Sequence, residues 1–226
     1  MSSRRVLFPL GLVLVIVGLV LVGYFAWQFY GTNIVAKQKQ EKNVEQLTAL
    51  WEKGDPATPS AEDGEISIGE ASALIRIPAF GKDYVMPVLE GTSDDVLAQG
   101  FAHFEQSANP GQVGNYALAA HRITHGEPLR RMPELRPGDK VLVETRRAIY
   151  TYELDTDPND LVVPFTAGWV VDEFPVNPDA GGVTPDPRGS KRLITLTTCS
   201  ELFHTDNRLI AFGHLVDVEQ KKSEQS

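Results

Sequence analysis

Cysteine is almost absent from this chain, since Cys199 is the only one among 226 residues. One thiol cannot form an intramolecular disulfide, and one cysteine with five scattered histidines lacks the ligand spacing of a structural zinc site. Basic residues number 21 against 30 acidic ones, and the net charge of −9 argues against nucleic-acid binding, which needs clustered Lys and Arg. Cys199 is therefore either a small buried side chain or a reactive one.

Charged residues are also missing from Val6 to Trp27. At ~1.5 Å per residue this apolar run covers the ~30 Å core of a bilayer. A cleaved signal peptide is the alternative, but its apolar region would be only about 7–15 residues long. The sequence thus predicts an uncleaved transmembrane anchor over residues 6–30, preceded by a cytoplasmic tail of residues 1–5.

A polar region follows the apolar run. Helical spacing of apolar residues from Asn33 to Trp51 predicts a short solvated helix, with a partner-binding helix as the alternative. The stretch "EKGDPATPSAEDGE" from Glu52 to Glu65 is rich in Pro, Gly and acid, which marks a linker. We expect residues 31–65 to form a polar stalk and linker, and residues 66–226 to form one domain.

Short strand-like runs divided by turn residues begin after Ile66. About eight strands with little helix predict a mainly β fold, a closed or nearly closed antiparallel barrel, because closure removes exposed strand edges. The stretch from Glu173 to Ser190 is too rich in Pro and Gly to be regular and predicts a long loop. The predicted strands are Ala73–Ile77, Tyr84–Leu89, Asn115–His121, Lys140–Thr145, Ala148–Leu154, Leu161–Pro164, Leu193–Cys199 and Leu209–Val218, with short helices at Ser93–Gly100 and Pro128–Met132.

Cys199 ends one of these predicted strands. Most lone core cysteines are small buried hydrophobes, but the flanks here, "TLTT" and "SELFHTDN", are more polar than a core centre. Strand alternation puts Thr195, Thr197 and Cys199 on one face, which favours a thiol that opens into a groove. A thiol with the ordinary pKa of about 8.5 is only ~3% ionised at pH 7, so a basic or cationic neighbour is expected.

His121 and Arg208 are the candidates for that neighbour. His121 ends the run "NYALAA", a rigid place from which to aim a side chain. Arg208 opens the strand after Cys199, and pairing of the two strands would bring Arg208 beside the thiol. Its guanidinium could lower the thiol pKa, hold a peptide carbonyl or stabilise an oxyanion; an exposed rim arginine or an ion pair with Asp206 is the alternative. The remaining histidines, expected at surface or packing positions, are His103, His125, His204 and His214.

These residues match a known family. "TLTTC", from Thr195 to Cys199, resembles the Thr-Leu-x-Thr-Cys signature of sortases, and the spacing to Arg208 with the following "RLIAFG" is similar to the sortase pattern. The segment from Pro87 to Arg122 resembles the family's first half in "EGTS", "PG" and "AAHR". The resemblance covers about Ala73 to Val218. It implies an eight-stranded sortase barrel on the outer side of a Gram-positive cell membrane, held there by a single anchor.

The resemblance also implies a function. Sortases are cysteine transpeptidases that recognise a sorting signal, typically Leu-Pro-x-Thr-Gly, near the C-terminus of secreted proteins. Cys199 would attack the Thr–Gly carbonyl to form a thioacyl intermediate, His121 would act as acid and base, and Arg208 would stabilise substrate and oxyanion. An amine, usually of a peptidoglycan precursor, would resolve the intermediate. No cofactor and no metal is implied.

The subclass follows from smaller features. "GNYALAAHR" and "TLTTC" are similar to actinobacterial class E housekeeping sortases, which tend to prefer Leu-Ala-x-Thr-Gly. In that class a tyrosine near the histidine is implicated in substrate choice, so Tyr116 is a candidate; strand alternation points it away from His121, and a packed core tyrosine is the alternative. Thr198 is a second candidate for substrate contact. The other functions considered are a pilus-assembling sortase and a membrane-tethered binding domain with an inert Cys199.

Overall fold

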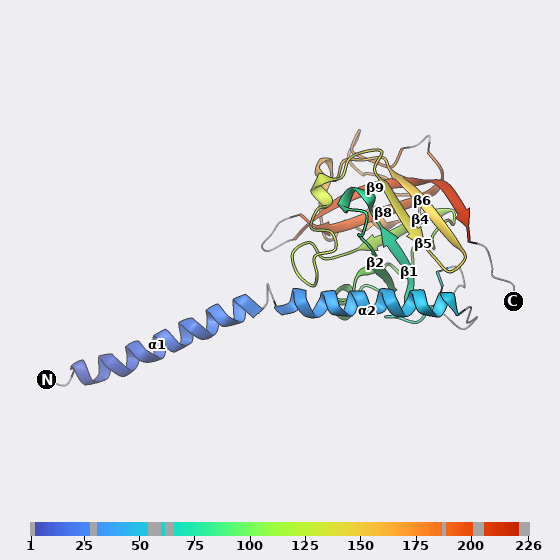
Figure 1. The fold of residues 1–226 in the computed structure, drawn as a ribbon. Helices are drawn as coiled ribbons and strands as arrows, with labels where there is room; N and C mark the ends of the chain where they lie inside the picture. Colours follow the sequence, from blue (N-terminus) through green and yellow to red (C-terminus); the bar gives the residue numbers. More distant parts are fainter. Residues whose placement is uncertain are drawn as a thin grey trace.

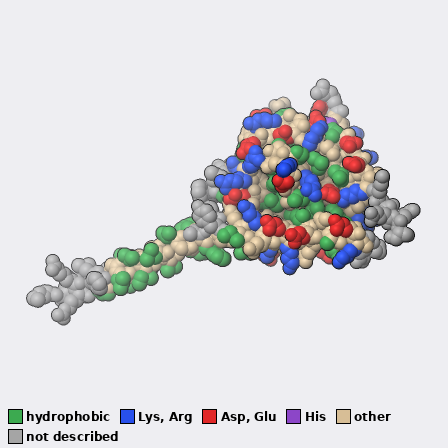
Figure 2. Space-filling view, in the orientation of Figure 1, with side chains coloured by type: hydrophobic (Ala, Val, Ile, Leu, Met, Phe, Trp, Pro, Cys, Tyr) green, Lys and Arg blue, Asp and Glu red, His purple; other side chains and the backbone are tan. Residues whose placement is uncertain are grey.

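The computed structural model describes residues 3–27, 31–53, 60–61, 66–186, 189–200 and 206–221. A β-barrel carries a long N-terminal helical arm, in which α1 (Ser3–Ala26) points away from the barrel and α2 (Thr32–Glu52) lies against it (Figure 1). Apolar side chains cover the visible face of α1, whereas charges of both signs are spread over the barrel (Figure 2). The predicted stalk helix is thus present, but it packs on the barrel.

The predicted transmembrane anchor over residues 6–30 is not confirmed. Across the described residues, no helix combines the length and the apolar character that crossing a membrane requires. The apolar run does not continue as one described helix, because α1 ends at Ala26 and residues 28–30 lie outside the described part of the chain.

Eight strands close into a barrel, as the sequence predicts. The strand order is β6-β5-β1-β2-β3-β4-β8-β9-β7, and an additional β6–β9 pairing joins the two sides. Closure depends on the length of β9, because its first half pairs with β8 and its second half with β6. β7 lies outside the ring, on the edge of β9. The strands are β1 (Ala71–Arg76), β2 (Met86–Glu90), β3 (Phe101–His103), β4 (Gly114–Ala119), β5 (Lys140–Glu144), β6 (Ala148–Leu154), β7 (Val162–Pro164), β8 (Arg192–Cys199) and β9 (Asn207–Gln220).

The barrel departs from the prediction in its mixed strand directions. β2 and β3 run parallel, and so do β4 and β8, because long connections return the chain to the same end before the next strand begins. The sequence also missed β3, which has only three residues and is too short to show alternation. The two predicted short helices are reduced to α3 (Asp94–Leu97) and the 3-10 turn η3 (Met132–Glu134).

The strand that carries the cysteine is buried on both faces. Ile194 and Leu196 face the main core, and Thr195 lies on the other face, where its hydroxyl donates to Asn115 Oδ1 at 2.8 Å. The 3-10 turn η5 (Gly168–Val171) covers that second face through Val170. The Thr195 face is therefore covered along most of β8, and only at its end does Cys199 become half-buried.

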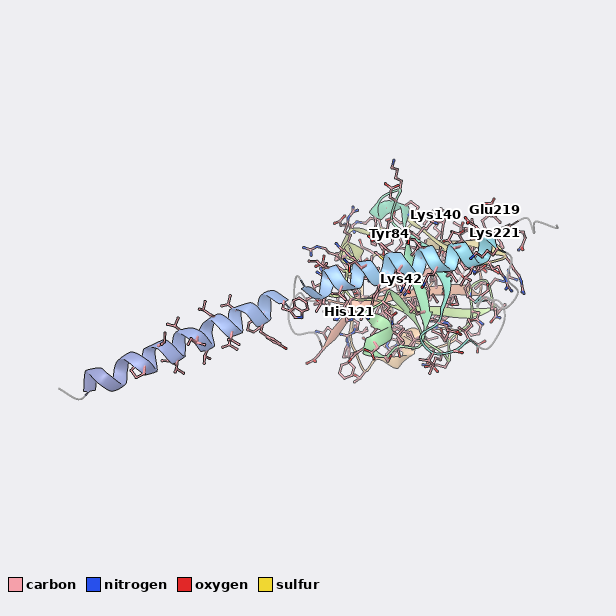
Figure 3. The ribbon with its side chains drawn as sticks, turned by 60° about the horizontal axis from the view of Figure 1, so that its bottom comes forward. Lys42, Tyr84, His121, Lys140, Glu219 and Lys221 are labelled. Carbon is pink, nitrogen blue, oxygen red and sulfur yellow. The ribbon has the colours of Figure 1, made fainter. Side chains whose placement is uncertain are left out.

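α2 lies across β1 and β2 and buries Ala36, Gln40 and Leu47. At its C-terminal end the ammonium of Lys221 lies 4.6 Å from the centre of the Trp51 ring, which ties α2 to the end of the barrel sheet (Figure 3). Lys221 also pairs with Glu144 at 2.7 Å. Both ends of the helix therefore contact the barrel, and the N-terminal half lies near His121 (Figure 3).

Candidate active site

Cys199 ends β8, Arg208 is the second residue of β9, and His121 follows the end of β4 by two residues. Cys199 and Arg208 are direct partners in the antiparallel β8–β9 ladder. On the other side of β8, the parallel register with β4 ends where Ala119 pairs with Thr197, two residues before His121 and Cys199. Neighbouring strands are about 4.8 Å apart, and residues opposite each other face the same side. The strand order β4–β8–β9 thus brings the three residues to the same end of the sheet, with Cys199 on the middle strand.

Hydrogen bonds from neighbouring residues hold the backbone around the thiol. Thr198 Oγ1 donates to the carbonyl of Ala120 at 2.7 Å, which ties the end of β8 to the residue before His121. Arg122 Nη1 donates to the carbonyl of Cys199 at 3.4 Å and also to the carbonyl of Ser200. The cysteine is a free thiol whose backbone is fixed on both sides. This arrangement suits a nucleophile, because a fixed backbone limits where the sulfur can point.

Burial makes His121 a weak base. The pKa of His121 is lowered to about 4, chiefly by loss of water around the imidazole and also by the charges of His125 and Arg208, while Asp94 acts in the opposite direction. The imidazole is therefore neutral at pH 7 in the protein without ligand. A neutral imidazole beside a thiol can accept its proton, which is the role that a general base needs.

His125 is a residue that sequence reasoning left among the packing histidines. Its ring stacks on that of His121, with ring centres 4.6 Å apart and planes at 28°. Burial lowers the pKa of His125, and Asp94 opposes the shift. The only signal in the sequence is its place four residues after His121, in "HRITH". Arg122 was likewise quoted only as part of "AAHR", and its contact with the cysteine backbone was not foreseen.

Arg208 is half-buried between two strands. It pairs with Cys199 on β8 and with Val163 on β7, and its Nη1 donates to the carbonyl of Asn207 at 3.0 Å. Phe165 follows β7 and is 65% exposed, so apolar surface lies beside the strand that carries the guanidinium. A bound peptide would find a cation and an apolar patch at this end of the barrel.

The two candidate substrate contacts lie in the interior. Tyr116 is 1% exposed and packs with the ring of His103, and Thr198 is 2% exposed. Tyr116 therefore has the burial of a packed core tyrosine and Thr198 joins two strands, while direct substrate contact by either residue stays a prediction.

The other histidines serve packing. His103 is buried against Glu90 at 2.9 Å, and His214 pairs with Asp155 at 2.6 Å. His204 lies outside the described residues. Among the side chains that the structure describes, His, Cys, Asp and Glu form no group of three or more that could hold a metal ion.

Comparison with known proteins agrees with this geometry. The family model described as the sortase domain matches residues 75–216, a range that includes the three strand ends. Sortase SrtE1 of Streptomyces coelicolor is 31% identical over 215 residues, covering 92% of this chain and 56% of that protein, so the chain spans just over half of this relative's length. Sortase SrtE2 of the same organism is 28% identical over 222 residues, covering 93% of the chain and 82% of that protein.

Solved structures give the same relationship. Sortase E from Streptomyces avermitilis superposes with a TM-score of 0.59 at 35% identity, covering 70% of this chain and 98% of that one. Sortase E1 from Streptomyces coelicolor, solved with a tripeptide in the active site, superposes with a TM-score of 0.56 at 31% identity. The match covers 67% of this chain and 91% of that one. These relatives are class E sortases. The match to the sortase domain and the similarity to these relatives show that the chain belongs to the sortase family.

Proposed function

We propose that this protein is a cysteine transpeptidase that cleaves a C-terminal sorting signal between Thr and Gly and joins the new acyl end to an amine. The observation that supports the proposal is that strands β4, β8 and β9 bring His121, Cys199 and Arg208 to the same end of the sheet. Membership of the sortase family, whose members are cysteine transpeptidases, supports the same reaction.

The first half of the reaction forms a thioester. The neutral imidazole of His121 takes the thiol proton, and the sulfur of Cys199 attacks the threonine carbonyl carbon. Arg208 donates hydrogen bonds to the oxygen, which carries negative charge in the tetrahedral intermediate. The C–N bond to glycine then breaks, and the imidazolium of His121 gives its proton to the departing amine.

The second half transfers the acyl group. An amine attacks the thioester carbonyl and His121 accepts the amine proton; the C–S bond then breaks, and the imidazolium of His121 returns a proton to the sulfur, which restores the thiol on Cys199. Two moderate steps replace the direct attack of an amine on a stable amide. We assign the amine to a peptidoglycan precursor, so that the product is a protein attached to the cell wall.

We further propose that the barrel works on the outer side of the cell membrane, where secreted proteins with sorting signals arrive. The relationship to class E sortases supports this site of action and a Leu-Ala-x-Thr-Gly signal in preference to Leu-Pro-x-Thr-Gly. A panel of peptides that differ only at the second position tests the preference.

Peptide cleavage with matched variants tests the reaction itself. Cys199→Ala is expected to abolish release of the glycine fragment, because no other thiol is present in the chain. Arg208→Lys keeps the charge but loses the planar fork and is expected to retain part of the activity lost in Arg208→Ala. Arg192→Ala removes an exposed arginine from the opposite end of β8 and serves as the control. Unchanged turnover in Cys199→Ala would refute the proposal.

A further inference from the structure

The turn that follows His121 has an uncommon backbone. Three consecutive residues, His125, Gly126 and Glu127, have positive φ values of 53°, 82° and 58°. Only glycine adopts this region freely, so His125 and Glu127 each pay a conformational cost that the surroundings must offset. Such strain points to a turn that is held in place by contacts from elsewhere in the fold.

Those contacts come from the N-terminal half of α2. Gln40 is 2% exposed, and its Nε2 donates to the carbonyl of His125 at 2.8 Å. Asn33 bonds the turn twice: its Oδ1 accepts from the amide of Gly126 at 2.9 Å, and its Nδ2 donates to Glu127 Oε1 at 3.0 Å. Two side chains about two helical turns apart on α2 therefore hydrogen-bond to three successive residues of the turn.

The fit is close enough that a side chain at Gly126 would displace the amide group of Gln40. A Cβ on Gly126 would meet the amide group of Gln40 at 2.4 to 2.9 Å, well inside contact distance. The backbone of the turn thus lies directly against a side chain of α2, and a displacement of that side chain would be passed on to the turn.

On its other side the turn supports His121. The ring of His125 stacks on the His121 ring, and His125 Nδ1 lies 3.0 Å from Thr124 Oγ1, which limits rotation of the ring. The amide of Leu129 donates to the carbonyl of His121 at 3.0 Å and closes the turn. The chain from His121 to Leu129 is therefore held between the candidate catalytic residues and α2.

We propose that His125 is a positioning residue of this active site, held by Asn33 and Gln40 of α2, and that its ring fixes the imidazole of His121 for proton transfer. The arm that precedes the barrel thereby becomes part of the catalytic apparatus, since α2 acts on the reaction through the turn. The effect on turnover rests on the proposed function, whereas the effect on His121 itself does not.

Several charged or titratable groups face this pair of rings and set its proton affinity. Asp94 of α3 favours the protonated form of His121, and Arg208 of β9 and a charged His125 disfavour it. Cys199 ends the neighbouring strand β8, at the same end of the sheet as His121. The α2 side chains that bond the turn are neutral amides, so α2 acts through geometry and burial and adds no charge there.

The direct test follows the His121 imidazole by NMR titration of histidine-labelled protein. His125→Ala removes both the stacking and the like charge, so the pKa of His121 is expected to rise from about 4 towards 6.5. His125→Phe keeps a ring that buries His121, so the rise is expected to be smaller. Gln40→Leu releases the turn and is expected to shift the titration in the same direction. No sorting peptide is needed for this measurement.

Peptide turnover supplies the second readout. Gln40→Leu and His125→Ala are expected to lower kcat by about tenfold or more with a smaller change in KM, because a misplaced acid–base group slows proton transfer. His125→Phe is expected to recover most of what His125→Ala loses. Gln38→Leu changes the same residue type at an exposed site of α2 and is the matched control.

The outcomes separate clearly. If wild-type protein cleaves no peptide but the His121 titration shifts as described, the proposed function fails and the positioning role stands. The positioning role is overturned if Gln40→Leu and His125→Ala leave both the titration and kcat unchanged, or if Gln38→Leu has equal effects. Thermal melting checks folding, and Asn33→Ala, at a half-buried position, replaces Gln40→Leu if that variant does not fold.

Discussion

The protonation state of His121 has a measurable effect on the free energy of unfolding. Its pKa is about 4 in the folded protein, chiefly because of burial, and about 6.5 when the chain is unfolded. Between these values the unfolded chain binds a proton that the folded protein does not, so stability falls as the pH is lowered from 6.5 to 4. Above pH 6.5 the contribution is constant. At 1.36 kcal/mol per pKa unit the full effect is about 3 kcal/mol, and about 2 kcal/mol of it is lost between pH 7 and pH 4.5.

Urea unfolding of the wild type and of His121→Gln measures this term. The amide of glutamine stays neutral at both pH values, and the titratable groups away from His121, His125 and Asp94 titrate equally in the two proteins. The free energy of unfolding should therefore fall between pH 7 and pH 4.5 by about 2 kcal/mol less in His121→Gln than in the wild type. An equal loss in both proteins would show that His121 is not held neutral by burial.

Three further predictions concern the contacts around the site and the arm. Thr198→Val leaves the buried carbonyl of Ala120 without its partner and should lower the free energy of unfolding by about 1–3 kcal/mol in urea titrations; a neutral result would contradict the role of this bond. Arg122→Ala frees the carbonyls of Cys199 and Ser200 and should lower kcat in peptide cleavage, and a change confined to KM would argue against it. Burial alone would raise the pKa of Glu144, but bonds from Lys221 and Arg76 lower it overall, so the pairing stabilises the protein above about pH 4.5 and is lost as the pH falls. Lys221→Met should therefore lower the melting temperature at pH 7 and have less effect at low pH; the same difference at both would exclude the ion pair as its cause.

Local patterns predicted the parts of the site that depend on short-range sequence. Cys199 and Arg208 lie on consecutive strands joined by a short connection, so their pairing follows from hairpin geometry. His121 was identified because it ends an apolar run, and a strand end holds a side chain in a defined place. The closed barrel followed from counting strands and from the cost of exposed edges.

Contacts between distant segments were beyond this reasoning. Gln40 is a polar residue on a polar helix, and nothing nearby indicates that its amide is buried against His125. The stacking of His125 depends on a left-handed turn that non-glycine residues rarely adopt. Alternation along β8 correctly grouped Thr195 with Cys199, but it could not reveal that η5 covers the threonine.

Intact-mass spectrometry after mixing the protein with a sorting-signal peptide tests the central claim most directly. Cys199 is the only thiol in the chain, so attack on the threonine carbonyl should add the mass of the peptide up to threonine, as a thioester on Cys199 that an added amine removes. Release of the glycine fragment without such an adduct, or an adduct of the same mass on Cys199→Ala, would contradict the account.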